Sequence, residues 1–145
     1  DGSADHADRL AVTYTFGGTK LRGAYERLRY QPAPGQSVYR DAWQLAATHS
    51  FGPHQLRASY TYGADAHGDT TKAVGGIGLP GSGSSAWQIS LGYGYTLSKR
   101  TEVWTSFTRL VNGETSRYNL SGNPLPQLTA GDAATAFGVG ITHKF

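Results

Sequence analysis

The last twelve residues of the chain alternate between two kinds of side chain, and this alternation restricts the fold more than any other feature. A large side chain recurs at every second position, at Phe137, Val139, Ile141, His143 and Phe145. Smaller or more polar residues fill the positions between them. A repeat of two is that of a β-strand, whose successive side chains point to opposite faces of a sheet. The sequence therefore predicts a strand over residues 134–145 with one apolar face.

The same alternation recurs along the chain and predicts six further strands. With the terminal strand, they cover residues 9–16, 20–30, 42–51, 55–63, 86–98, 101–111 and 134–145. Tight-turn sequences separate the first, third and fifth strands from their successors. Longer connections, including a loop of about ten residues over Gln31–Asp41, occupy the other gaps. One end of the predicted sheet therefore carries short turns and the other carries loops. Trp104 is an exception to the alternation, because it falls on the polar face.

Aromatic residues cluster at two levels of the apolar face. Phe16 and Phe51 lie beside short turns, and Trp43 and Trp87 lie toward the opposite rim. The full predicted girdle consists of Phe16, Phe51, Trp43, Tyr60, Tyr62, Trp87, Tyr93 and Tyr95. Strands of about ten residues with aromatic girdles, short turns and long loops are typical of outer-membrane barrels. A soluble β-sandwich also has an alternating face, but its core favours Val, Ile and Leu and its surface carries more Lys and Glu. The pattern favours an all-β, antiparallel transmembrane barrel.

Composition excludes several other classes of protein. The chain has no run of about 18 apolar residues, which a membrane helix needs, and its mean hydropathy is −0.43. That value does not exclude a barrel, since half of each barrel strand faces water. A net charge of +3 with 16% charged residues is too dilute for a nucleic-acid surface. Cysteine is absent, which excludes disulfides. Residues 1–8 do not resemble a leader, so we expect any export signal to have been removed or to lie in a missing part.

No residue pattern indicates catalysis, a metal or a cofactor. The five histidines, His6, His49, His54, His67 and His143, lack the spacing of metal ligands. The Gly-rich segment 75–85 has no lysine of a phosphate-binding loop, and a flexible extracellular loop is the favoured interpretation. Asp65, His67 and Asp69 could attract a cation, although a solvated loop again explains them better. We expect no enzyme.

Two C-terminal motifs and one nearer the N-terminus resemble the trimeric general porins of betaproteobacteria. Residues 91–104, with a Ser-Lys-Arg-Thr turn, look like the penultimate hairpin of that family. Residues 138–145 look like its terminal strand with a His-Lys-Phe end, and Gly23–Glu26 is similar to an inner hairpin. The resemblance implies a water-filled barrel of about sixteen strands, of which seven are present here. The chain is then expected to be the C-terminal part of a porin, starting within a loop, with the constricting loop in the missing part.

The resemblance also implies partners. We expect a homotrimer in contact with outer-membrane lipid and lipopolysaccharide, with no nucleic acid bound. The barrel-insertion machinery is expected to read the end of the chain as an assembly signal, which comprises Phe145, Ile141, Val139 and Phe137.

With Phe145 facing lipid, the opposite face lines the lumen. The charged residues expected there are Arg22, Glu26, Arg57, Glu102, Arg9 and Lys144. Arg22 and Arg57 lie within their strands and are expected to act directly on passing ions, whereas Arg9 and Lys144 are expected at the rim. The small inward residues Gly, Ser and Thr leave room for water. The sequence thus predicts passive diffusion of ions and small hydrophilic solutes with a preference for anions. The alternative is an adhesin or ligand-binding barrel that acts through its long extracellular loops.

Overall fold

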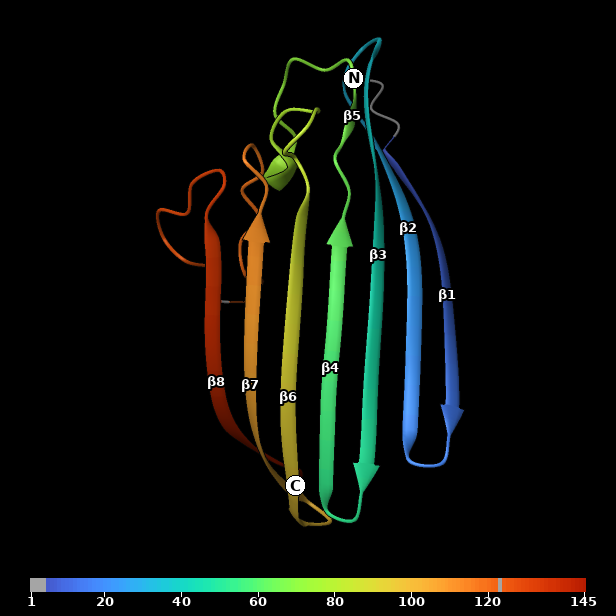
Figure 1. Ribbon diagram of the computed structural model, residues 1–145, viewed down its shortest axis with the longest axis vertical. Helices are drawn as coiled ribbons and strands as arrows, with labels where there is room; N and C mark the ends of the chain where they lie inside the picture. Colours follow the sequence, from blue (N-terminus) through green and yellow to red (C-terminus); the bar gives the residue numbers. More distant parts are fainter. Residues whose placement is uncertain (1–4, 123) are drawn as a thin grey trace.

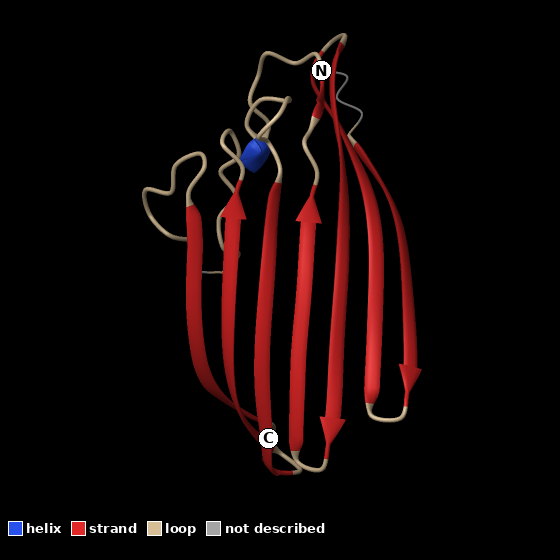
Figure 2. Ribbon diagram, in the orientation of Figure 1, coloured by secondary structure: helices blue, strands red, loops and turns tan. Residues whose placement is uncertain are grey.

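The computed structural model describes residues 5–122 and 124–145 and consists of one antiparallel sheet (Figure 1). Its strands follow one another in the order β1-β2-β3-β4-β6-β7-β8, and the two-residue β5 pairs with β3. Their bounds are His6–Phe16 for β1, Thr19–Ala33 for β2, Gln36–Phe51 for β3, His54–Gly63 for β4, His67–Gly68 for β5, Ala86–Ser98 for β6, Thr101–Asn112 for β7 and Ala133–His143 for β8. The single 3₁₀ turn of the described residues, η1, spans Gly75–Ile77. Figure 2 shows that strands dominate the molecule. The predicted all-β antiparallel architecture is confirmed.

The sheet is open, with β1 and β8 at its two edges in the part of the chain described. Short turns join β1 to β2, β3 to β4 and β6 to β7 at one end, which is the lower end in Figure 1. The long connections between β4 and β6 and between β7 and β8 lie at the other end, together with the start of β1. No helix among the described residues is long and apolar enough to cross a membrane.

The predicted ten-residue loop over Gln31–Asp41 is wrong. β2 continues to Ala33 and β3 starts at Gln36, so only Pro34 and Gly35 turn the chain. Gly35 has a φ of 74°, which suits a turn with proline before glycine. The hairpin rises above its neighbours (Figure 1). Its upper part lacks the apolar alternation because charged side chains occupy the continuation of the apolar face, and this loss made the segment resemble a loop.

Apart from the two-residue β5, which was not predicted, the other differences from the predicted bounds are small and lie at strand ends. β1 starts at His6, three residues earlier than predicted, and β8 ends at His143 and not at Phe145. The Lys144 backbone N–H still donates to the Arg100 carbonyl at 2.9 Å. Lys144 is therefore held beside the β6–β7 turn without forming part of the strand ladder.

The two faces of the sheet differ in exposure as well as in chemistry. One face, called the apolar face here, carries the alternating large residues from Leu10 in β1 to Ile141 in β8. Leu10, Leu45 and Phe137 are 67%, 63% and 74% exposed. A monomeric soluble protein rarely leaves so continuous an apolar surface uncovered. The opposite face, called the polar face, carries mainly small, hydroxyl, amide and charged residues.

The buried core lies on the polar face, at the end with the long connections. One cluster joins Val38 of β3 to Ala66 and Ile77 of the β4–β6 connection. A second joins Leu110 of β7 and Ala134 of β8 to Leu120 of the β7–β8 connection. Both long connections therefore fold inward over the polar face.

The β7–β8 connection also contains a local hydrogen-bonded turn. The Thr129 backbone N–H and hydroxyl both donate to Asp132 at 2.7 Å. These hydrogen bonds lower the pKa of the Asp132 carboxyl.

Candidate functional site

The polar face carries an excess of positive charge, and register fixes which strands supply it. Arg22 lies opposite Thr13 of β1 and Ala46 of β3, and Arg57 lies opposite Thr48 and Gly92. The cationic residues on this face and its C-terminal continuation are Arg9, Lys20, Arg22, Arg40, Arg57 and Lys144. The carboxylates of the strands on this face are Glu26 and Glu102.

Both of these carboxylates are paired. Glu26 lies 3.7 Å from Arg9 across the β1–β2 pair, and Glu102 accepts a hydrogen bond from the Arg57 guanidinium at 2.7 Å. The Arg57 Nε atom also donates to Gln55. The Arg57 and Glu102 side chains are 41% and 30% exposed, so water can screen this pair. Of the six charged residues predicted for the lumen face, the two carboxylates therefore each offset one arginine.

Arg22 and Lys144 remain without an ion-pair partner among the described residues. Arg22 is exposed and lines a hollow of about 260 Å³ with Arg9, Gln44 and small residues of β1–β3. Lys144 lies at the turn end, where it lines a hollow of about 470 Å³ with Arg57, Glu102 and Trp104. Arg22 is therefore the mid-strand guanidinium whose charge acts most freely on this face.

Trp104 lies on the polar face, in agreement with its break in the sequence alternation. Its ring covers two glycines of β8: a Cβ at Gly138 would lie 3.5 Å from ring atom Cζ3, and one at Gly140 would overlap ring atom Cζ2. The two glycines thus leave room for an aromatic side chain on the polar face.

Arg40 is a site residue that sequence reasoning missed, because the predicted loop removed it from any face. It lies on the polar face of β3, opposite Leu28 of β2. Although charged, it is only 7% exposed. Val38, Arg40 and Ala42 lie at every second position of β3. This alternation, had it been followed through the predicted loop, would have assigned Arg40 to the polar face.

On the apolar face, aromatic rings form an upper row across four neighbouring strands. Tyr25, Trp43, Tyr62 and Trp87 are successive cross-strand partners. The ring centroids are 5.7 Å apart for Tyr25 and Trp43, and 5.9 Å for Trp43 and Tyr62. Tyr60 contributes a ring 6.4 Å from Trp87. Aromatic pairs at such spacings attract one another.

A lower aromatic group lies near the short turns of the same face. His54 stacks on Phe51 at 5.0 Å and contacts Tyr95 at 5.1 Å, and its Nδ1 lies 2.7 Å from the Tyr93 hydroxyl. Phe16 lies beside the β1–β2 turn, where it contacts Tyr14. Trp43 and Phe51 are eight residues apart on β3, or roughly 26 Å along a strand. With a tilt of about 40°, the levels are roughly 20 Å apart, close to the band of about 25 Å in outer-membrane barrels.

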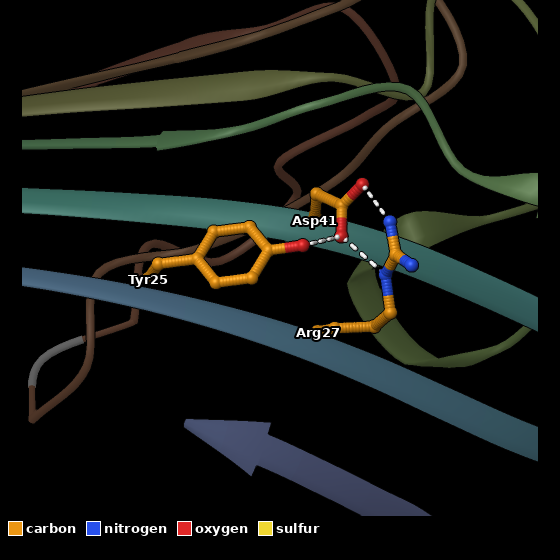
Figure 3. Close-up of polar contacts among 3 residues, drawn as sticks. All are labelled: Tyr25, Arg27 and Asp41. Carbon is orange, nitrogen blue, oxygen red and sulfur yellow. Dashed lines mark hydrogen bonds and ion pairs between the residues drawn. The ribbon is translucent and has the colours of Figure 1, made fainter. Parts of the chain in front are cut away.

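Charged groups follow the upper aromatic row along β2 and β3, and Figure 3 shows their contacts with Tyr25. Asp41 accepts hydrogen bonds from the Tyr25 hydroxyl and from Arg27 Nε at 2.7 Å, and from Arg27 Nη2 at 2.9 Å. The tyrosine ring therefore marks the boundary between apolar and charged surface, with its hydroxyl on the charged side. This change of chemistry is that expected where a membrane surface meets water.

The residues predicted as an assembly signal all lie on the exposed side of the edge strand. Phe137, Val139 and Ile141 are on the apolar face of β8, and Phe145 follows the strand end. The ring of Phe145 contacts that of His143 at 5.0 Å. Its side chain is otherwise available to another surface.

The histidines serve local hydrogen bonding and stacking. His49 lies 2.8 Å from the Thr19 hydroxyl, and His143 lies 2.9 Å from that of Thr101. Within the described ranges, no group of three or more His, Cys, Asp or Glu residues could hold a metal ion.

Comparison with known proteins agrees with this arrangement. The model of the Gram-negative porin family matches residues 1–115. Outer membrane porin protein 32 of Delftia acidovorans is 27% identical over 139 residues, which cover 94% of this chain and 36% of that protein. The chain thus spans little more than a third of the curated relative that it matches.

Two solved structures share the fold. An anion-selective porin from Comamonas acidovorans is 25% identical, with a TM-score of 0.74, over 97% of this chain and 40% of the other. The outer-membrane expressed OmpT of Vibrio cholerae superposes with a TM-score of 0.68 at 17% identity, over 96% of this chain and 41% of the other. The family match covers most of the chain, and the porin fold extends over nearly all of it. The chain belongs to the Gram-negative porin family and is an outer-membrane protein that crosses the bilayer with β-strands.

Proposed function

We propose that this chain is the C-terminal segment of a porin barrel that lets ions and small hydrophilic solutes diffuse across the outer membrane, with a preference for anions. The apolar face, between its two aromatic levels, faces lipid. The polar face lines a water-filled lumen. The complete barrel has about sixteen strands and assembles as a homotrimer, in contact with lipopolysaccharide and inserted by the barrel-insertion machinery. It acts as a channel and not as an enzyme.

The observation that carries the anion preference is the charge balance of the polar face. Its two strand carboxylates are each paired with an arginine, so Arg22 and the other cations leave a net positive wall. A guanidinium stays charged at any physiological pH. Water and salt screen the wall over about 8 Å at physiological ionic strength, so it biases ion traffic without blocking cations. The anion selectivity named for the Comamonas acidovorans relative supports the same sign.

The test is the reversal potential of the complete barrel in a planar bilayer under a KCl gradient. We expect the parent protein to favour chloride and Arg22→Gln to move the reversal potential toward that of potassium. Arg29→Gln is the matched control, since Arg29 lies in the same strand but on the opposite face. It removes the same charge and should move the potential less. A parent that favours potassium, or equal shifts in the two variants, contradicts the proposal. A protein that forms no channel would favour the adhesin or ligand-binding alternative.

A further inference from the structure

Arg40 is a buried cation without an ion-pair partner among the described residues. Its side chain lies under the long connections at the upper end of the polar face, and the residue is 7% exposed. Its Nε atom has no hydrogen-bond partner, and no carboxylate of the described residues forms an ion pair with it. Burial of an unpaired charge is costly, and proteins normally compensate it with an ion or an opposite charge.

The surroundings hold the guanidinium in one place. The Arg40 Cζ atom lies 4.6 Å from the centroid of the Tyr118 ring, in a cation–π contact. A Cβ at Gly63 would overlap the Arg40 Nη2 atom, and one at Gly76 would lie 2.7 Å from Cδ1 of the Tyr118 ring. Two glycines from different segments therefore leave room for the cation and for the ring above it. Glycine is needed at positions where other groups approach the backbone this closely.

The guanidinium lines a cavity of about 640 Å³ between the polar face and the folded connections. Apolar and aromatic side chains form much of its lining, including Leu28, Ile77, Leu110, Tyr30 and Tyr118. Thr61, Gln88 and Asn119 add polar groups. A volume of this size is that of a small-molecule site, in which an apolar lining and a few polar groups fix the ligand.

The nearby carboxylates have other hydrogen-bond partners. Asp5 lines the cavity and accepts the Gln31 backbone N–H at 2.9 Å. Asp65 accepts the Ser85 backbone N–H at 2.7 Å. Neither is within ion-pair distance of Arg40, although Asp65 attracts it from beyond that distance. The cavity therefore presents a guanidinium without an ion pair beside an apolar wall.

We propose that this cavity is a binding site for a small organic carboxylate with an apolar body, whose carboxylate pairs with Arg40. The guanidinium offers a planar fork that matches a carboxylate, and the apolar lining would cover an aromatic ring or a short aliphatic chain. The inference rests on the proposed channel function and deepens it: the site lies at the loop end of the lumen, where it would collect one class of anionic solute before passage.

The test is a calorimetric titration of the complete barrel, refolded in detergent, with benzoate as the probe. Benzamide has the same ring and a neutral head group, and inorganic phosphate has charge without an apolar body. A titration of empty micelles corrects for partitioning. We expect saturable binding of benzoate that is at least tenfold tighter than that of either comparison ligand. Equal binding of benzamide would overturn the role of charge, and equal binding of phosphate would overturn the assigned class of ligand.

Variants locate the site. Arg40→Met should weaken benzoate binding at least tenfold, whereas Arg29→Met, which removes a charge from the opposite face, should leave it unchanged. Gly63→Ala keeps every charge but displaces the Arg40 guanidinium, and it should also weaken binding. It provides the decisive variant if Arg40→Met does not fold. Unchanged benzoate affinity in a folded Arg40→Met or Gly63→Ala barrel contradicts the proposal. Because calorimetry does not require ion flow, failure here is distinct from failure of the conductance test.

Discussion

At the scale of single residues, glycines on the polar face are of two kinds, which the sequence alone does not separate. Gly140 lies beneath the Trp104 ring, and any Cβ there would overlap it. A Cβ at Gly92 would make only ordinary contacts, the nearest at 3.5 Å from Arg57 Cβ. Alternation alone marked Trp104 as an exception. It did not show which residue on the neighbouring strand the ring covers, because that depends on the register of β7 and β8.

This difference predicts the outcome of two alanine substitutions. Gly140→Ala should lower the free energy of unfolding by about 1–3 kcal/mol, because the ring must move or the strands must separate. Gly92→Ala is the control and should change it by less than about 0.5 kcal/mol. Urea unfolding of the complete barrel in lipid vesicles gives both values.

A double mutant identifies the cause. Trp104→Ala removes the ring, so adding Gly140→Ala to that variant should cost much less than it does in the parent. Equal costs in the two backgrounds would mean that Gly140 is needed for another reason, such as backbone conformation.

At the scale of the element, the sequence predicted strands well where lipid-type and polar surfaces alternate, and poorly elsewhere. β6 was predicted with its observed bounds, Ala86–Ser98, because each of its faces has one chemical character. The upper β2–β3 hairpin was missed because charged residues such as Arg27 and Asp41 continue the apolar face above the aromatic row. β5 was missed as well, since two residues without alternation become a strand only through pairing with Val38 and Tyr39. The predicted charged residues of the strands lie on one face, as the alternation indicates, but Lys20 and Arg40 of the same face were not among those predicted.

The two faces of β6 provide a direct test of which one meets lipid. Leu91 lies midway between Trp87 and Tyr95 on the apolar face, and Ser90, the preceding residue, points to the polar face. Leu91→Arg should lower the free energy of unfolding by about 2–4 kcal/mol, the cost of a cationic side chain near the bilayer midplane. Ser90→Arg should cost less than about 1 kcal/mol, because the new charge meets water. The proposed orientation is wrong if the two substitutions cost the same in lipid vesicles.

At the scale of the whole molecule, the two ends of the sheet differ in kind. The loop end has buried clusters, a cavity and folded connections over the polar face. The turn end has short turns and the C-terminus, and the lower aromatic group lies near it. Solute selection is therefore expected at the first end and membrane insertion at the second.

Phe145 allows assembly to be separated from stability. The residue lies beyond the end of β8 and its ring contacts only the His143 ring among the described aromatic pairs. Its backbone neighbour Lys144 is fixed independently through Arg100. Deletion of Phe145 therefore removes little packing within the sheet, and refolding of the complete barrel into detergent should be nearly unchanged. If the insertion machinery reads this side chain, however, the same deletion should strongly reduce the amount of barrel inserted in cells.

Phe16→Ala, at another turn of the same face, is the control for the deletion of Phe145. It truncates an exposed aromatic side chain of the same kind without altering the chain end, and it should leave insertion in cells largely intact. Quantifying folded barrel in outer membranes and in refolding reactions distinguishes the two roles, and an equal loss in both assays would reduce Phe145 to a packing residue.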